Sequence, residues 1–364
     1  MKTMYQNYSE LATEVNRLEN MKRDFILPTP VATVQDDGQH IHLEGNDGAY
    51  RGVMNTHFIQ QLCAHHKLPY SYVKTMVDRG QPELIAKNLN TWLHNPVAGS
   101  GPRLFRTYDK NGYDNAEFRS CHSHRFLTFD HFDLLQGLAP VLQRLEDQVN
   151  GLQYMSMGLT DNKIYLKIIF PNVESEIKGK QVGDIVKSGV LISNSEVGAG
   201  SIVVSPFIYR LICTNGMTVA DAGTRRRHLG KAQDEGELLY KRDTKVAMHL
   251  ALQKQLRDHV EECADPAKFQ LTVDKINESA EEQDQRDPED VIEGIGKKFS
   301  LSDGEVKKAR RSLLENGDYS RWGFANAVTS VADMIDNYDR SSELQEMGGN
   351  VIQLPKRDWM AVAA

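Results

Sequence analysis

Three stretches in the middle of the chain decide its fold: KIYLKIIF at residues 163–170, VKSGVLIS at 186–193 and SIVVSPFIYRL at 201–211. Each is short, rich in β-branched and apolar residues, and bounded by turn residues, which is the pattern of β-strands. In the first stretch the apolar residues alternate with polar or mixed neighbours, as in a strand with two different faces. The sequence therefore predicts a β-rich core over residues 151–211.

The connection between the last two stretches is Asn194-Ser195-Glu196-Val197-Gly198-Ala199-Gly200. Its glycines predict a tight turn with positive φ. The segment lacks the Lys-Ser/Thr pair of a phosphate-binding loop, and Ser195 is not in a G-x-S-x-G elbow. Since no other recognised catalytic motif is present, the sequence favours a binding protein over an enzyme and implies no cofactor.

Helices and short strands are expected on the N-terminal side of this core. We expect a helix over residues 8–21, a turn at Asp36-Asp37-Gly38 between two short strands, and a helical block over residues 56–94. Asn111-Gly112 is a strong hairpin signal, and a helix over residues 132–145 should follow the hairpin. Pro140 makes the middle of that helix doubtful, because proline removes a backbone donor.

The last third of the chain is expected to be helical. Ser302-x-x-Glu305 is a capping-box signature, and the small residues of Asn326-Ala327-Val328-Thr329 would allow close helix packing. The predicted fold class is α+β, with an antiparallel β-rich core, an N-terminal helical block and a helical C-terminal third. The expected segments are residues 1–100 (strands and helical block), 101–245 (β-rich core with a basic cluster), 246–340 (helical region) and 341–364 (C-terminal tail).

Composition limits the functional classes. The 364 residues include 43 basic and 50 acidic side chains, so the net charge of -7 does not suggest general electrostatic binding to nucleic acid. The four cysteines are widely spaced and predict buried, reduced thiols. We see no signal-peptide core and no apolar run long enough for a membrane span, which favours the cytoplasm.

Histidines gather in two places and raise the alternative of a metal site. His65-His66 follow His57 on an expected helix, and His122, His124 and His131 are near Asp130 and Asp133. Imidazole and carboxylate are common metal ligands, but no second ligand pair has a recognisable spacing. Histidines that only form hydrogen bonds are therefore preferred, and a metal-dependent hydrolase ranks last.

Basic and aromatic residues are interleaved in the core segment and suggest a nucleic-acid site. Arginines bind phosphates bidentately, and aromatic faces stack on bases, a combination typical of single-strand binding. The alternative is a solvated basic face, or arginines that pair with the acidic flanks. The candidate contact residues are Arg225, Arg226, Arg227, His228, Arg106, Arg119, Arg125, Tyr108, Tyr209 and Arg210.

Several segments resemble a family of phage and plasmid proteins, the domain-of-unknown-function group numbered nine-three-two. The order of these segments is preserved over about residues 50–354, although Ser123-His124 stands where that family has Ser-Asp. The matching segments include Gln61-Leu62, Leu68-Pro69-Tyr70, Asn88 to Leu93, Ser123-x-Arg125-Phe126, Cys213-x-Asn215-Gly216, Arg227-His228, Asn326 to Thr329 and Gly348-Gly349.

The resemblance implies a mobile-element protein of the host-cell cytoplasm and supplies no established activity. A looser fold-level similarity is to phage single-strand annealing proteins, which bind single strands and form rings, so it implies a homo-oligomer. The leading hypothesis is a phage-encoded nucleic-acid-binding protein of DNA replication or recombination that favours single-stranded DNA. The alternative is a host-takeover or anti-defence protein that binds a host protein or a small ligand without catalysis.

Overall fold

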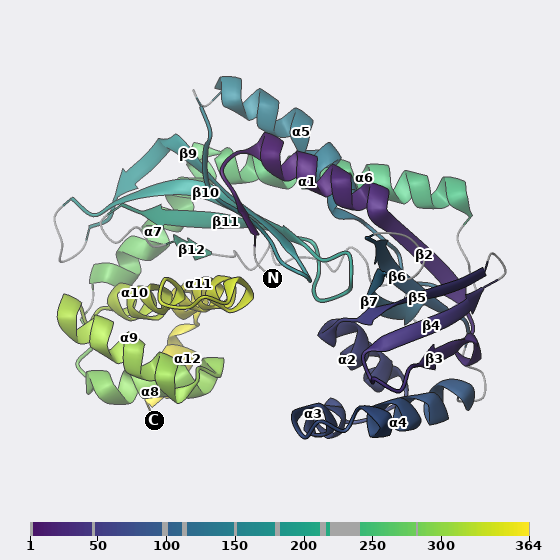
Figure 1. Ribbon diagram of the computed structural model, residues 1–364. Helices are drawn as coiled ribbons and strands as arrows, with labels where there is room; N and C mark the ends of the chain where they lie inside the picture. Colours follow the sequence, from purple (N-terminus) through teal and green to yellow (C-terminus); the bar gives the residue numbers. More distant parts are fainter. Residues whose placement is uncertain are drawn as a thin grey trace.

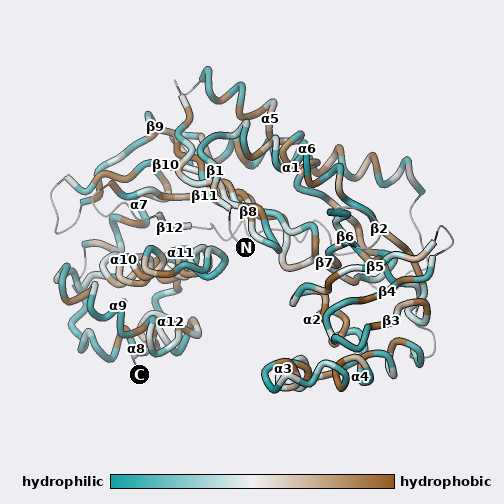
Figure 2. Tube along the Cα trace, viewed as in Figure 1, coloured by the Kyte–Doolittle hydropathy of each residue, from teal (hydrophilic) through white to brown (hydrophobic). Residues whose placement is uncertain are grey.

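Two six-stranded sheets flanked by helices make this an α+β protein, as predicted (Figure 1). Figure 2 shows hydrophobic residues gathered along the strands, whereas outer helices such as α9 are mostly hydrophilic. The computed structural model describes residues 3–45, 48–96, 101–110, 115–148, 151–178, 183–211, 216–218, 241–281 and 283–363.

The first sheet contains the strands predicted from residues 151–211, and all its neighbouring strands are antiparallel. Three helices cover one face: α1 (Tyr8–Met21), α5 (His131–Gln148) and α6 (Arg242–Ala264). Buried apolar side chains of β9 and β10 meet these helices in the largest core cluster. In spatial order the strands are β1 (Thr3–Tyr5), β8 (Gln153–Leu159), β9 (Ile164–Glu176), β10 (Ile185–Asn194), β11 (Val203–Arg210) and β12 (Gly216–Thr218).

Helix α5 is continuous, although Pro140 lies inside it. The proline is on the exposed side of the helix, while Leu138, Val141 and Leu142 are buried against the first sheet. Water can therefore solvate the carbonyl group that the proline leaves without a donor. The helix expected over residues 132–145 is therefore confirmed, and Pro140 does not interrupt it.

The second sheet is built mostly from the N-terminal part of the chain. Its neighbouring strands are antiparallel, except that β5 and β7 pair in parallel. The expected turn between β3 and β4 is confirmed, with Gly38 at φ +66. In spatial order the strands are β2 (Lys22–Leu27), β6 (Arg103–Asp109), β7 (Ala116–Ser123), β5 (Gly48–Met54), β4 (His40–Gly45) and β3 (Ala32–Val34).

One face of the second sheet is covered by the helical block expected over residues 56–94. Phe58, Leu62 and Leu89 from these helices pack with Phe105 and Phe118 from the strands. The block consists of α2 (Thr56–His65), α3 (Tyr70–Asp78) and α4 (Pro82–His94), and a short 3-10 turn, η1 (Thr29–Val31), precedes β3.

The parallel pair β5–β7 depends on a glycine. A Cβ atom on Gly52 would lie 2.2 Å from the backbone oxygen of Ala116, its partner in the register. We expect Gly52→Ala to lower the free energy of unfolding by about 1–3 kcal/mol, because two strands must move apart. Gly304→Ala is the matched control, since its Cβ meets open space in α9. Equal thermal unfolding midpoints for both variants would contradict this packing.

The C-terminal third is helical, as predicted. The capping box of Ser302 and Glu305 begins α9, and nearly all residues of α10 are buried. A Cβ on Gly348 would lie 2.3 Å from Thr329 Cγ2, so small residues do bring α10 and α11 together. The helices are α7 (Pro266–Glu281), α8 (Pro288–Phe299), α9 (Asp303–Asn316), α10 (Arg321–Ala332), α11 (Tyr338–Gln353), α12 (Lys356–Met360) and the 3-10 turn η2 (Ala361–Ala363).

The expected division into four consecutive segments differs from this topology. Strand β1 pairs with β8 in the first sheet, and β2 pairs with β6 in the second, so residues 1–100 are interleaved with the β-rich core. Residues 341–364, expected to be a tail, contain most of α11 and all of α12. Among the described residues, none of the helices has both the length and the apolar character needed to cross a bilayer.

Candidate functional site

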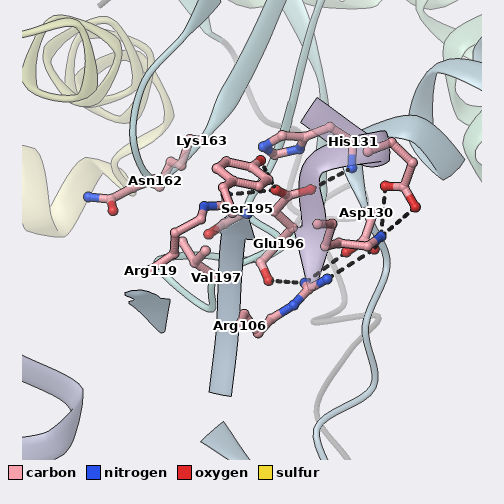
Figure 3. A network of polar contacts seen from close by, with 12 residues as sticks. Arg106, Arg119, Asp130, His131, Asn162, Lys163, Ser195, Glu196 and Val197 are labelled. Carbon is pink, nitrogen blue, oxygen red and sulfur yellow. Dashed lines mark hydrogen bonds and ion pairs between the residues drawn. The ribbon is translucent and has the colours of Figure 1, made fainter. Parts of the chain in front are cut away.

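A loop between β10 and β11 reaches from the first sheet to the second and lies at the centre of a polar network (Figure 3). This loop, residues 195–200, is the Gly-bearing connection seen in the sequence. Gly198 has φ +73, which confirms the expected turn, and the Ala199 N–H donates to Ser195 Oγ at 2.8 Å. The turn places Glu196 and Val197 against residues of the second sheet.

The Glu196 carboxylate is buried and accepts three contacts. Arg119 Nη2 lies 2.6 Å from Oε1, the Tyr108 hydroxyl donates to Oε1 at 2.7 Å, and the His131 N–H donates to Oε2 at 3.1 Å. The Arg119 guanidinium also stacks on the Tyr108 ring, 3.7 Å from its centroid. Burial alone would raise the pKa of Glu196, but His131, Arg119 and Arg106 hold that pKa well below its usual range.

Arg106 is fully buried and joins the same network from β6. Its Nη1 donates to the Glu196 backbone oxygen at 2.5 Å, and its Nη2 donates to Asp130 Oδ2 at 3.0 Å. Asp24 lies 3.1 Å from Arg106 Nε. Lys22, which is on the same strand as Asp24, pairs with Asp130. Burial would raise the pKa of Asp130, yet Arg106 and Lys22 together hold it below its usual value. We call Arg106, Arg119, Glu196, Asp130, Lys22, Asp24 and Tyr108 the junction cluster.

Histidines complete the contacts of the loop. The Val197 carbonyl accepts from Gln61 Nε2 at 2.8 Å and lies 2.8 Å from His57 Nε2. The His122 ring lies against Gly198, where a Cβ would approach Cε1 to 2.5 Å, and stacks on Phe126. Burial lowers the pKa of His122 to about 3, so this ring is neutral near pH 7. In the part of the chain that the structure describes, no group of three His, Cys, Asp or Glu side chains could hold a metal ion.

A small polar cavity of about 180 Å³ opens beside the cluster, with Arg119, Tyr108 and His131 in its wall. The Nη1 atom of Arg119 is buried and has no hydrogen-bond partner in the described part of the chain. The cavity is large enough for water, which would satisfy this donor. Within the junction cluster three cations, Arg106, Arg119 and Lys22, pair with three carboxylates, Glu196, Asp130 and Asp24, so their formal charges balance.

The structure corrects four of the predicted nucleic-acid contacts. Arg106, Arg119 and Tyr108 are buried in the junction cluster. Arg210 is also buried, where it pairs with Asp184 at 2.6 and 2.7 Å and stacks on Trp322. A guanidinium that is buried and already bound to a carboxylate is not available to a phosphate on the surface.

The remaining predicted contacts have different positions. Arg125 is exposed in the turn after β7, and the structure gives it no ion pair among the described residues. Tyr209 is half-buried against the aromatic cluster of Tyr165, Phe207 and Tyr338. Arg225, Arg226, Arg227 and His228 lie outside the described residues, as does Cys213, whereas the three other cysteines are buried and free, as expected.

Sequence reasoning missed the acidic half of the cluster. The sequence alone gives no role to Glu196, Lys22 or Asp24, and it places Asp130 only among possible metal ligands. The available signal was a single carboxylate in a loop of small and apolar residues, Val197 to Gly200, which predicts burial with a cationic partner. The alternative that arginines pair with acidic residues describes Arg106, whose partners include Asp24 from the N-terminal flank.

Comparison with known proteins assigns the chain to a family. A family model described as Domain of unknown function (DUF932) matches residues 122–347, more than half of the chain. The chain therefore belongs to this family, which confirms the resemblance in the sequence. No curated protein and no solved structure matches it.

Proposed function

We propose that the protein binds nucleic acid, with single-stranded DNA favoured, in replication, recombination or protection of mobile-element DNA in the cytoplasm of a host cell. The observation that carries this proposal is the run Arg225-Arg226-Arg227-His228. Three consecutive arginines provide several bidentate phosphate donors within one short segment. Such contacts supply sequence-independent affinity, as an annealing protein needs.

The structure refines which residues belong to this proposal. Arg125 remains a candidate because it is exposed, and the partly exposed Phe126 is next to it. Tyr209 remains a candidate stacking residue because it is only half-buried. We exclude Arg106, Arg119, Tyr108 and Arg210 from the proposed DNA contacts and assign them a structural role.

The junction cluster has a supporting role in this proposal. It connects β6 and β7 of the second sheet to the β10–β11 loop of the first through buried charge pairs. Buried charge pairs demand good geometry, and they favour one arrangement of the parts that they join. The cluster would thus keep Arg125, which follows β7, and Tyr209, which lies in β11, in a constant relative position.

The proposal is tested by measuring DNA binding and particle size together. The full chain is mixed with a labelled single-stranded oligonucleotide and analysed by gel filtration with light scattering. We expect co-elution at low salt and its loss at high salt, because counterion release drives phosphate binding. A complex several times the mass of one chain would support a ring. A free oligonucleotide at low salt would overturn the proposal.

A further inference from the structure

A second cavity, of about 610 Å³, lies in the C-terminal helical part, away from the junction cluster. Side chains from α7, α10, α11 and α12 line it, together with the segment 283–286 that follows α7. Sites for small molecules usually have volumes of about 300–1,000 Å³, so the cavity could enclose a metabolite.

The wall of this cavity carries more positive than negative charge. Its described cationic residues are Lys275, Arg286, Arg321 and Lys356, whereas its carboxylates are only Glu278 and Asp284. Asp284 is already held by Arg286, whose Nε and Nη2 donate to it at 2.9 and 2.5 Å. Arg321 and Lys356 have no ion pair with a carboxylate among the described residues.

Arg321 is bound by backbone carbonyl groups and not by a carboxylate of the described residues. Its Nε donates to the Val351 carbonyl at 2.7 Å, and its Nη2 donates to the Leu354 carbonyl. No carboxylate pairs with it among the described residues, and burial lowers its pKa to about 10. The guanidinium is still charged at neutral pH, and a half-buried charge of this kind is stabilised by an anion.

Gln353 provides an independent sign of a missing ligand. Its Nε2 atom is buried and has no hydrogen-bond partner among the residues that the structure describes, although the residue lines the cavity. A buried amide donor without an acceptor costs about 1–3 kcal/mol. An oxyanion in the cavity would supply that acceptor, so charge and hydrogen bonding point to the same kind of ligand.

We propose that this cavity binds a small organic phosphate, with the phosphate group held by Arg321 and the Gln353 amide and approached by Lys356. A phosphate monoester carries a charge of about -1.5 to -2 near pH 7, which suits a wall that contains Arg321 and Lys356. The apolar side chains of Ile352, Leu354 and Met360 would contact the organic part. This site goes beyond nucleic-acid binding and does not depend on it.

The test is calorimetric titration of the full chain with inorganic phosphate, AMP and uncharged adenosine. We expect one site per chain with a Kd below about 1 mM for AMP, weaker binding of phosphate and no binding of adenosine. Gln353→Glu keeps the shape of the side chain and places a carboxylate near Arg321. This variant should fold, gain thermal stability and bind AMP at least about tenfold more weakly.

Gln255→Glu on the exposed side of α6 adds the same charge away from the cavity and should bind AMP like the unmodified protein. Lys356→Gln removes a charge at the exposed rim without touching the core, and it should also weaken AMP binding. The proposal is overturned if AMP and phosphate do not bind, or if Gln353→Glu binds AMP as tightly as Gln255→Glu. Because these variants leave Arg225 to Arg227 intact, failure of this site and failure of DNA binding are separate results.

Discussion

Glu196→Gln should lower the free energy of unfolding by about 3–5 kcal/mol, the cost of breaking a buried ion pair by removing one partner. The glutamine has almost the same shape, but its single carbonyl oxygen replaces only one of the two carboxylate oxygens, so either the Tyr108 hydroxyl or the His131 N–H loses its acceptor. It loses the negative charge that compensates Arg119 and Arg106, which are both buried. Urea denaturation at neutral pH measures the difference.

Glu174→Gln is the matched control, because Glu174 also pairs with a cation but is half exposed, 3.4 Å from Lys187. An exposed pair of this kind contributes about 0–1 kcal/mol. The pKa of Glu196 is lowered by folding, so its contribution is present above the unfolded-state pKa of about 4.3 and is lost as the pH falls further. On acidification, the Glu196→Gln variant should therefore lose less stability than the unmodified protein loses. Equal losses for the two variants at neutral pH would contradict a junction held by charge.

Replacement of Arg225, Arg226 and Arg227 by alanine should weaken binding of single-stranded DNA by roughly 100-fold or more. Each hydrogen bond to a charged group contributes about 1.5–3 kcal/mol, and about 1.4 kcal/mol corresponds to a factor of ten. The loss should be similar for different base sequences, since phosphate contacts carry no sequence information. Fluorescence anisotropy of labelled oligonucleotides at fixed salt measures the change.

The control for this triple variant changes basic residues elsewhere. Lys297, Lys298 and Lys307 are exposed in α8 and α9, so their replacement by alanine removes the same total charge. A general charge effect would weaken DNA binding equally in both triple variants. A specific site predicts near-normal affinity for the lysine variant and an unchanged unfolding temperature for the arginine variant.

The strands of the first sheet could be predicted from the sequence because their patterns are local. Apolar and other residues alternate over 164–170, residues 185–194 are rich in β-branched side chains, and Gly198 marks the turn. The capping box at Ser302 is local in the same way. The pairing of β1 with β8 joins residues more than 150 positions apart and leaves no local signal.

The candidate site was harder to predict for a related reason. An arginine looks the same in sequence whether it faces water or a buried carboxylate. Arg106 and Arg125 both follow aromatic or small residues in similar segments, yet one is fully buried and the other is exposed. Arg106 is buried against Glu196, which is 90 residues away in the sequence and lies in a loop of the other sheet. The sequence therefore shows where the arginines are in the chain, but it does not show which of them are buried against a carboxylate.

The salt dependence of DNA binding tests the central claim most directly. The logarithm of the affinity for single-stranded DNA should fall linearly with the logarithm of the salt concentration, with a slope of about -0.7 for each phosphate contact. Loss of Arg225 to Arg227 should reduce that slope by about 2, whereas loss of the three lysines should leave it unchanged. Equal slopes for the unmodified protein and the arginine variant, or no binding by either, would contradict the proposed nucleic-acid site.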